Sequence, residues 1–179
     1  MSSAYDTVTP LDPPAPLPPG ALAWRVHREG GPDYDEVGPW TDEPDKAQWV
    51  DPDTGLDCLV VRNYMGGLCG YVGVPADHPD FGVEYDDVDV SVHGGLTFAG
   101  RCWTPPGVDE GQPSAGVCHV PFEGRPHEVY WLGFDCGHYQ DYQPGMGKHF
   151  SFMKREDTYR DLAYVVEEVT TLAAQLAER

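Results

Sequence analysis

Residues 58–74, with the sequence CLVVRNYMGGLCGYVGV, contain two apolar runs that flank the turn Met65-Gly66-Gly67. Runs of this length are typical of β-strands, and glycine accepts the positive φ angles that tight turns need. The stretch therefore predicts an antiparallel hairpin with arms at residues 58–64 and 68–74.

Four further segments have strand character, namely residues 22–27, 88–92, 96–99 and 128–134. Apolar and polar residues alternate in the first two, so that Val88, Val90 and Val92 face one way. The third is expected to continue the second after a bulge at Gly94-Gly95. Residues 29–57 are predicted to form a long loop anchored by Trp40 and Trp49, and the proline-rich residues 104–126 an irregular excursion.

The C-terminal segment predicts a long helix that begins at Thr158, because Thr158 is a good N-cap and Asp161 resembles the second residue of a capping box. Apolar residues recur there at steps of three and four: Tyr159, Leu162, Val166, Val169, Ala173 and Leu176. Such a stripe packs on a sheet face. The predicted fold class is therefore α+β, a mainly antiparallel β-sheet packed against one long C-terminal α-helix.

The N-terminal residues 1–20 contain six prolines and are predicted to form a flexible, extended arm. Residues 21–179 are long enough for one domain with a proper core, so they are predicted to form a single α+β domain. No internal repeat divides this part of the chain.

The 179 residues carry a formal net charge of −19, which repels nucleic acid and anionic lipid. No basic patch interleaved with aromatic residues is present, so direct nucleic-acid binding is excluded. An apolar stretch of about 18 residues and a secretory signal are also missing, so no membrane association is expected. The acidity serves solubility, or it attracts a basic partner.

Five cysteines are present, without a CxxC pair. An odd number without a secretory signal favours a soluble protein of a reducing cytoplasm. Cys58 and Cys69 lie on the two arms of the predicted hairpin. They either face one another or, as the composition favours, serve as small core residues.

Two predicted strands end on groups capable of chemistry. The run Trp131–Phe134 stops at Asp135, and Cys136, His138 and Asp141 follow within six residues. The run 88–92 ends on His93, which Gly94 and Gly95 follow. Polar side chains in a loop bordered by glycine, directly after a strand, are typical of a binding pocket. The sequence does not predict whether His93 and His138 meet.

Three kinds of site are compatible with these residues. Asp135, His138, Asp141 and His93 are suitable ligands for a divalent transition metal such as Zn²⁺, Mn²⁺ or Fe²⁺, which activates water for hydrolysis. Alternatively, Cys136 is a nucleophile, with His138 or His93 as its base and Asp135 orienting the imidazole. His93, Asp135, Cys136 and His138 are therefore the candidate catalytic residues.

The third kind of site binds a small molecule without turning it over. The backbone of Gly94 and Gly95 and the aromatic rings of Trp131 and Tyr139 suit a base or a sugar. A phosphate would need a cation, for which Arg62 is a candidate, together with Arg101, Arg125 and Lys148. The alternative without function is that Asp135 and His138 cap a turn, His93 satisfies a buried loop and Cys136 belongs to the core.

Two motifs, VHGGLTF at residues 92–98 and WLGFDCGH at residues 131–138, resemble a family of small proteins encoded in bacteriophage genomes and mobile elements. Residues 68–75, 85–91 and 158–165 share the resemblance, which extends over roughly residues 55–178. It implies an accessory protein that counters host defence by sequestering or degrading a signal nucleotide, or by blocking a defence protein. Such a protein would act in the cytoplasm of the bacterial host.

Three functional hypotheses follow. The first is a phage-type accessory protein that binds a small, nucleotide-like ligand in a pocket lined by His93, Asp135, His138 and Asp141. The second is a metal-dependent hydrolase that uses the same cluster. The third is an acidic inhibitor that binds a host defence protein through charge complementarity. The partner is thus a small molecule or a host protein, and the sequence does not predict the oligomeric state.

Overall fold

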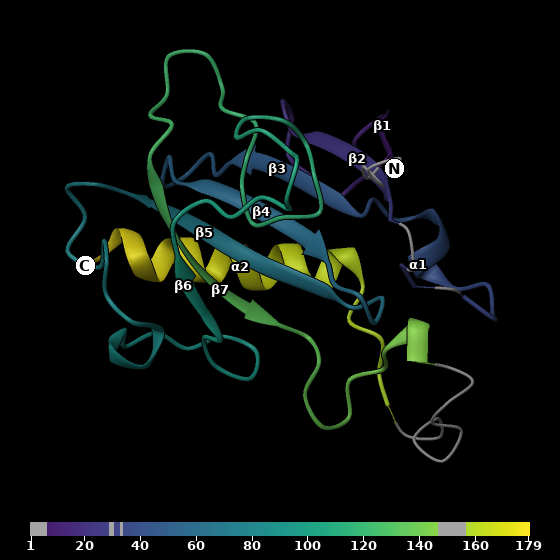
Figure 1. Cartoon of the computed structure of the whole chain (residues 1–179). Helices are drawn as coiled ribbons and strands as arrows, with labels where there is room; N and C mark the ends of the chain where they lie inside the picture. The colour runs from purple at the N-terminus through teal and green to yellow at the C-terminus, as the bar shows by residue number, and fades with distance from the viewer. Residues whose placement is uncertain (1–6, 29–30, 33, 147–156) are drawn as a thin grey trace.

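The computed structural model describes residues 7–28, 31–32, 34–146 and 157–179. It contains one seven-stranded antiparallel sheet, with strand order β1-β2-β3-β4-β5-β7-β6, and one long C-terminal helix (Figure 1). The strands are β1 (Thr7–Leu11), β2 (Leu22–His27), β3 (Lys46–Val50), β4 (Asp57–Arg62), β5 (Leu68–Pro75), β6 (Phe98–Gly100) and β7 (Val129–Asp135). The helices are α1 (Pro39–Asp42) and α2 (Leu162–Ala177), with 3-10 turns η1 (Tyr85–Asp87) and η2 (Pro144–Met146). The predicted α+β class is confirmed.

The predicted hairpin forms the centre of the sheet. β4 and β5 pair in antiparallel register from Asp57 opposite Gly73 to Arg62 opposite Leu68. The backbone N–H of Asn63 donates to the carbonyl of Gly67 over 2.8 Å, and Gly66 has a φ of +86°. Both strands are buried on both faces, which explains why their sequences are continuously apolar rather than alternating.

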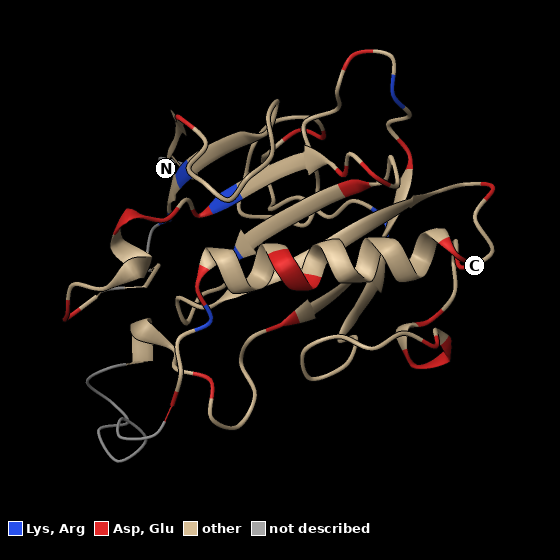
Figure 2. Cartoon of the chain, turned by 180° about the vertical axis from the view of Figure 1, so that it is seen from behind, with Lys and Arg blue, Asp and Glu red and all other residues tan. Residues whose placement is uncertain are grey.

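Helix α2 covers one face of the sheet (Figure 2). Its apolar stripe, with Val165, Val169 and Leu172 fully buried, packs against residues of β4, β5 and β7. The helix begins later than predicted. Asp161 is the N-cap, and its carboxylate accepts a hydrogen bond from the backbone N–H of Tyr164 over 2.9 Å. Thr158 instead lies in an isolated parallel bridge with Asp141.

The opposite face of the sheet is covered by the long connection between β6 and β7, which contains the predicted irregular excursion (Figure 1). Lys46 of β3 donates from its amine to the carbonyls of Gly116 and Cys118, at 2.9 and 2.6 Å. Gln48 exchanges two hydrogen bonds with the backbone of Val120. A second apolar cluster, which includes Trp131, lies beneath this connection.

The strand predicted at residues 88–92 does not form. The segment pairs with no strand of the described part of the chain, and side chains of α2 bind its backbone instead. Ser91 exchanges two backbone hydrogen bonds with the amide of Gln175, and the N–H of His93 donates to Glu168 over 2.7 Å. The predicted strand at residues 96–99 appears in shortened form as β6, which pairs with β7 at the sheet edge.

Two strands lie in regions where none was predicted. β1 falls within the predicted flexible arm, of which residues 1–6 lie outside the described part, and pairs with β2. Its Pro10 is tolerated because β1 is an edge strand. β3 falls within the predicted loop of residues 29–57, where Trp49 occupies the core as expected for an anchor. The residues on either side of β3 are polar, which is why a loop was predicted. Pairing with β2 and β4 nevertheless makes this segment a strand.

The cysteines divide into two groups. Cys58, Cys69 and Cys136 are free and buried, as core residues would be, and Cys58 and Cys69 lie in different apolar clusters. Cys102 and Cys118 form a disulfide that the sequence did not predict. Because disulfides persist mainly in oxidising compartments, this bond weighs against the predicted reducing environment. Among the described residues, no helix is both long and apolar enough to cross a membrane.

Candidate functional site

His93, His138 and Asp141 converge at the end of β7. His93 comes from the connection between η1 and β6, and the other two from the turn that follows β7. The Nε2 atom of His93 lies 2.7 Å from Oδ2 of Asp141, and the two imidazole rings lie 5.5 Å apart, edge to face. One potential metal-ligating atom from each of the three residues lies within 4.8 Å of the other two. The structure thus joins two of the predicted segments into one site.

Asp141 is the buried centre of this cluster. Its carboxylate accepts hydrogen bonds from His93, from the backbone N–H of His138 at 3.0 Å and from the guanidinium of Arg160 at 2.9 Å. Burial raises the pKa of Asp141, but these hydrogen bonds outweigh it and hold the pKa below its ordinary value. Asp141 is therefore an anion, held in one orientation by three separate segments.

His93 is oriented from its far side. Its Nδ1 atom lies 2.8 Å from the hydroxyl of Tyr164 on α2, and its backbone N–H is bound by Glu168. Burial and the nearby carboxylate of Glu168 raise the pKa of Tyr164, so that its hydroxyl keeps its proton. The contact between Tyr164 and Nδ1 orients the ring, so that Nε2 points toward Asp141.

The ring of His138 packs against the backbone of Gly94. Its ring lies so close to Gly94 that a Cβ atom there would stand 2.2 Å from the ring. Its Nδ1 atom is buried and has no hydrogen-bond partner within the described part of the chain. Carboxylate oxygens of Asp141 and Asp135 lie 3.7 and 3.9 Å from this atom. The close approach expected at Gly94 is therefore made by a side chain.

Cys136 does not take part in this arrangement. Its side chain is buried in the apolar cluster beneath α2. Burial, together with nearby Cys69 and Asp141, raises the pKa of the thiol far above its ordinary value. The predicted nucleophilic role of Cys136 requires an accessible thiolate, and this environment opposes one.

The predicted ligand-binding residues are dispersed. Trp131 is fully buried in the second cluster, on the other face of the sheet. Arg62 is also buried and binds Asp45, Glu43 and the hydroxyl of Tyr159. Tyr139 is 87% exposed. Of the proposed residues for stacking and for phosphate binding, neither Trp131 nor Arg62 reaches the cluster.

The remaining residues considered for ligand binding fall into three groups. Arg101 and Arg125 pair with Glu128 and Asp57, and Lys148 lies outside the described residues. Gly94 and Gly95 both have positive φ, and a Cβ on Gly95 would meet open space. Asp135, the last residue of β7, lies at the margin with its side chain 36% exposed.

Sequence reasoning missed three residues that support the site. Arg160, Tyr164 and Glu168 contact Asp141 or His93 and follow one another at steps of four. Tyr164 and Glu168 lie four residues apart on α2 and so share one side of the helix, whereas Arg160 precedes the N-cap Asp161. The polar pair beside the apolar stripe was therefore the available signal.

Comparison of the chain with protein-family models, with curated proteins and with solved structures gives no match. The function is accordingly inferred from the geometry of the site.

Proposed function

We propose that this chain is a metal-dependent hydrolase whose metal ligands are His93 Nε2, His138 Nδ1 and Asp141 Oδ2. One observation carries the proposal. The Nδ1 atom of His138 is buried, has no hydrogen-bond partner in the described structure and faces two carboxylates. A buried polar atom without a partner costs free energy, and a bound cation would remove that cost.

The distances are close to those of a metal centre. The ligand atoms of a tetrahedral Zn²⁺, with bonds of about 2.0–2.2 Å, lie about 3.3–3.6 Å apart. His138 Nδ1 and Asp141 Oδ2 are 3.7 Å apart, and His93 Nε2 and the same oxygen are 2.7 Å apart. A shift of His93 by less than 1 Å would open the space that an ion needs, about 0.6 Å by this comparison.

Neighbouring side chains orient the proposed ligands, as the hydrogen-bonding partners around a metal site usually do. Ligating histidines usually bind a fixed partner through the second ring nitrogen, which sets the tautomer. Tyr164 takes this place on His93: its hydroxyl oxygen would accept the proton of Nδ1, which leaves Nε2 unprotonated for the metal. Arg160 holds the second oxygen of Asp141. Both partners leave the atoms that would bind the metal facing inward.

The chemistry follows from the metal and from Asp135. These residues would hold a divalent metal, which would supply a water-derived nucleophile near neutral pH. The Oδ1 atom of Asp135 lies 3.9 Å from Nδ1 of His138 and accepts the N–H of Gly137. We assign this partly exposed carboxylate the role of proton acceptor. A nucleotide-like phosphodiester is the substrate class that the resemblance to phage proteins favours.

Replacing His138 by alanine is expected to weaken Zn²⁺ binding by about a hundredfold or more, because loss of a direct ligand exceeds the 10–100-fold cost of losing an outer-shell partner. Titration calorimetry on the disulfide-bonded protein measures this loss. Tyr139→Ala, which removes the exposed neighbour, should bind as the wild type does. Equal affinity of His138→Ala and the wild type would refute the site. Hydrolysis of nucleotide phosphodiesters by the Zn²⁺-loaded protein, lost in the same variant, tests the activity.

Gly94 and Gly95 offer a matched pair of controls. Both have positive φ, so alanine introduces a similar backbone strain of about 1 kcal/mol at either position. Only at Gly94 would the new methyl group strike the ring of His138. Gly94→Ala should therefore lose metal affinity and Gly95→Ala should keep it. Equal losses would mean that strain, rather than the position of His138, controls binding.

The acidic surface favours a second candidate function, the inhibition of a basic host protein. Six of the described arginines already lie within 4 Å of an aspartate or glutamate, and Lys46 is buried. Little positive charge therefore remains to offset the 30 acidic residues. Figure 2 shows acidic positions spread along the loops of both ends of the sheet.

This second candidate predicts a steep dependence on salt. A partner held by surface charge should lose at least about tenfold in affinity between roughly 0.05 M and 0.5 M salt, because the Debye length falls below the separation of exposed charges. Asp86→Lys together with Asp87→Lys, both exposed on η1, should slow association. Surface plasmon resonance against a captured host protein measures both effects. An affinity that does not change with salt would argue against charge complementarity.

A further inference from the structure

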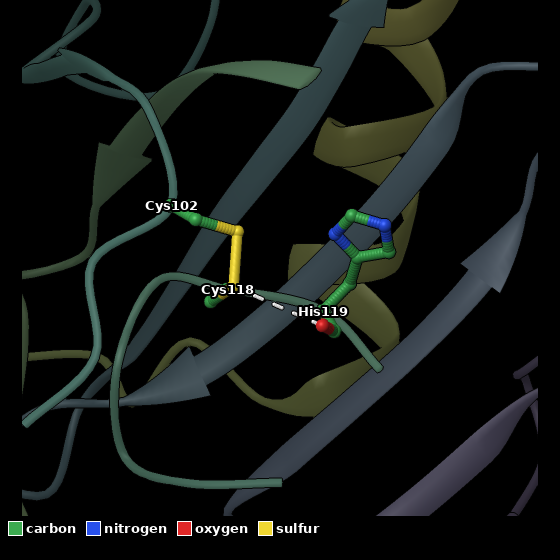
Figure 3. Close-up of side chains that lie close together, drawn as sticks. All are labelled: Cys102, Cys118 and His119. Carbon is green, nitrogen blue, oxygen red and sulfur yellow. Dashed lines mark hydrogen bonds between the residues drawn. A yellow bond between two sulfur atoms is a disulfide. The ribbon is translucent and has the colours of Figure 1, made fainter. Parts of the chain in front are cut away.

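A second group of metal-ligating side chains lies on the face of the sheet opposite α2. Cys102, Cys118 and His119 come together in the connection between β6 and β7, and one ligand atom of each fits within 4.8 Å (Figure 3). Figure 3 shows one ring nitrogen of His119 on the side of the disulfide. This group shares no residue with the site at His93.

His119 is the unusual member. Its side chain is 2% exposed, and both ring nitrogens are buried without a hydrogen-bond partner among the described residues. The ring packs edge to face against Trp131 at 5.3 Å between centroids. A buried imidazole normally finds at least one partner, because leaving a polar atom unsatisfied is costly. The structure offers His119 no such partner while the two sulfur atoms are bonded to each other.

We propose that, once the Cys102–Cys118 disulfide is reduced, Cys102, Cys118 and His119 bind one Zn²⁺ ion. Two thiolates and one imidazole are a ligand set that zinc prefers, with bonds of about 2.3 Å to sulfur and 2.0–2.1 Å to nitrogen. The ion would give the buried imidazole its missing partner. The chain would thus exchange a covalent cross-link for a metal cross-link at the same place.

The exchange balances with a dithiol as the reductant. The dithiol gives two electrons and two protons to the sulfur–sulfur bond, so that two thiols form on the protein and the dithiol becomes a disulfide. Binding of Zn²⁺ then displaces one proton from each thiol, and His119 coordinates through a neutral nitrogen. No other oxidant or reductant is needed.

The backbone of this region is held independently of the disulfide. Lys46 binds the carbonyls of Gly116 and Cys118, and Gln48 binds both backbone groups of Val120. Reduction therefore leaves Cys118 and His119 attached to the sheet at both sides. Preorganised ligands favour metal binding because less conformational freedom is lost.

One member of the group, Cys102, borders a pocket that is open to solvent. A surface pocket of about 230 Å³ is lined by Arg101, Cys102, Glu110, His127, Glu128 and Val129. It gives a reductant and a metal ion access to Cys102. A water molecule in this pocket would complete the four ligands of the ion, as in zinc sites with three protein ligands.

The test uses Co²⁺ as a spectroscopic substitute for Zn²⁺ in the full chain carrying His138→Ala, which disables the site at His93. The protein is compared after treatment with a phosphine reductant and after oxidation. We expect one equivalent of Co²⁺ with a thiolate-to-metal charge-transfer band in the reduced protein, and no such band in the oxidised protein. Addition of Zn²⁺ should abolish the band.

Two variants separate this site from the other thiols. Cys102→Ser with Cys118→Ser should lose the band, whereas Cys58→Ala, which removes a buried thiol in the other apolar cluster, should keep it. His119→Gln should weaken Co²⁺ binding at least tenfold. The proposal is overturned if the reduced protein shows no band, or if the band survives in the double serine variant. The comparison of reduced and oxidised protein decides the question even if a variant does not fold.

Discussion

Replacement of Arg62 by alanine is expected to lower the free energy of unfolding by about 3–5 kcal/mol, the usual cost of breaking a buried ion pair from one side. The guanidinium is 2% exposed and binds Asp45 at 2.8 Å, Glu43 at 3.3 Å and the hydroxyl of Tyr159 at 2.8 Å. Glu43 also accepts the N–H of Leu162, the first residue of α2. Without Arg62, two partly buried carboxylates would lose their counter-charge where the hairpin meets the helix.

Arg101→Ala is the matched control for this prediction. Arg101 pairs with Glu128, but the two side chains are 62% and 60% exposed. Exposed ion pairs contribute about 0–1 kcal/mol, so this variant should unfold nearly as the wild type does. Urea denaturation of the two variants measures the difference. Similar losses in both would show that the Arg62 network does not stabilise the fold.

Replacement of Lys46 by methionine is expected to make the variant lose stability relative to the wild type as the pH rises above about 7. Burial lowers the pKa of Lys46 from 10.5 to about 7, and the charge of Arg28 acts in the same direction. Between these two values the unfolded chain binds a proton that the folded chain does not bind. The stability of the wild type therefore gains up to about 1.4 kcal/mol per pH unit from this residue.

The comparison with Lys46→Met isolates this contribution. Buried thiols with raised pKa, such as Cys69 at about 11, oppose it above about pH 9, but they are present in both proteins and cancel. Denaturation from about pH 7 to about pH 9 should shift the difference in stability between the two proteins by roughly 2–3 kcal/mol in favour of the wild type. Below about pH 7 the difference should stay constant, because the lysine is charged in both states. A difference that does not change with pH would mean that Lys46 keeps its proton in the folded state.

Several elements of the fold were predictable because their signals are local. The hairpin around Gly66 is defined by two apolar runs and by glycines that allow the turn. Helix α2 is defined by an apolar stripe at helical spacing, although its N-cap is Asp161 rather than Thr158. β7 needed only its run of apolar residues. Each of these signals lies within a few residues of the structure that it specifies.

The segment 88–92 shows where local signals fail. Its alternation of valine with polar residues is that of a strand, yet the sheet edge beside β7 is taken by β6. Its backbone groups are instead bound by Gln175 and Glu168, which lie more than 70 residues away in the chain. Periodicity reports which side of a segment is apolar, but it does not identify the partner of the backbone.

Short-range periodicity and turn chemistry are sufficient to predict the α+β class, the central hairpin and the residues that end β7. Three further facts become visible only in the folded chain: His93 meets Asp141 across 48 residues, Arg62 and Trp131 lie elsewhere, and Cys102 pairs with Cys118. These contacts join segments that are far apart in the chain, and no local sequence pattern indicates which distant segments will meet. Their meeting depends on strand order and on which face of the sheet each connection crosses.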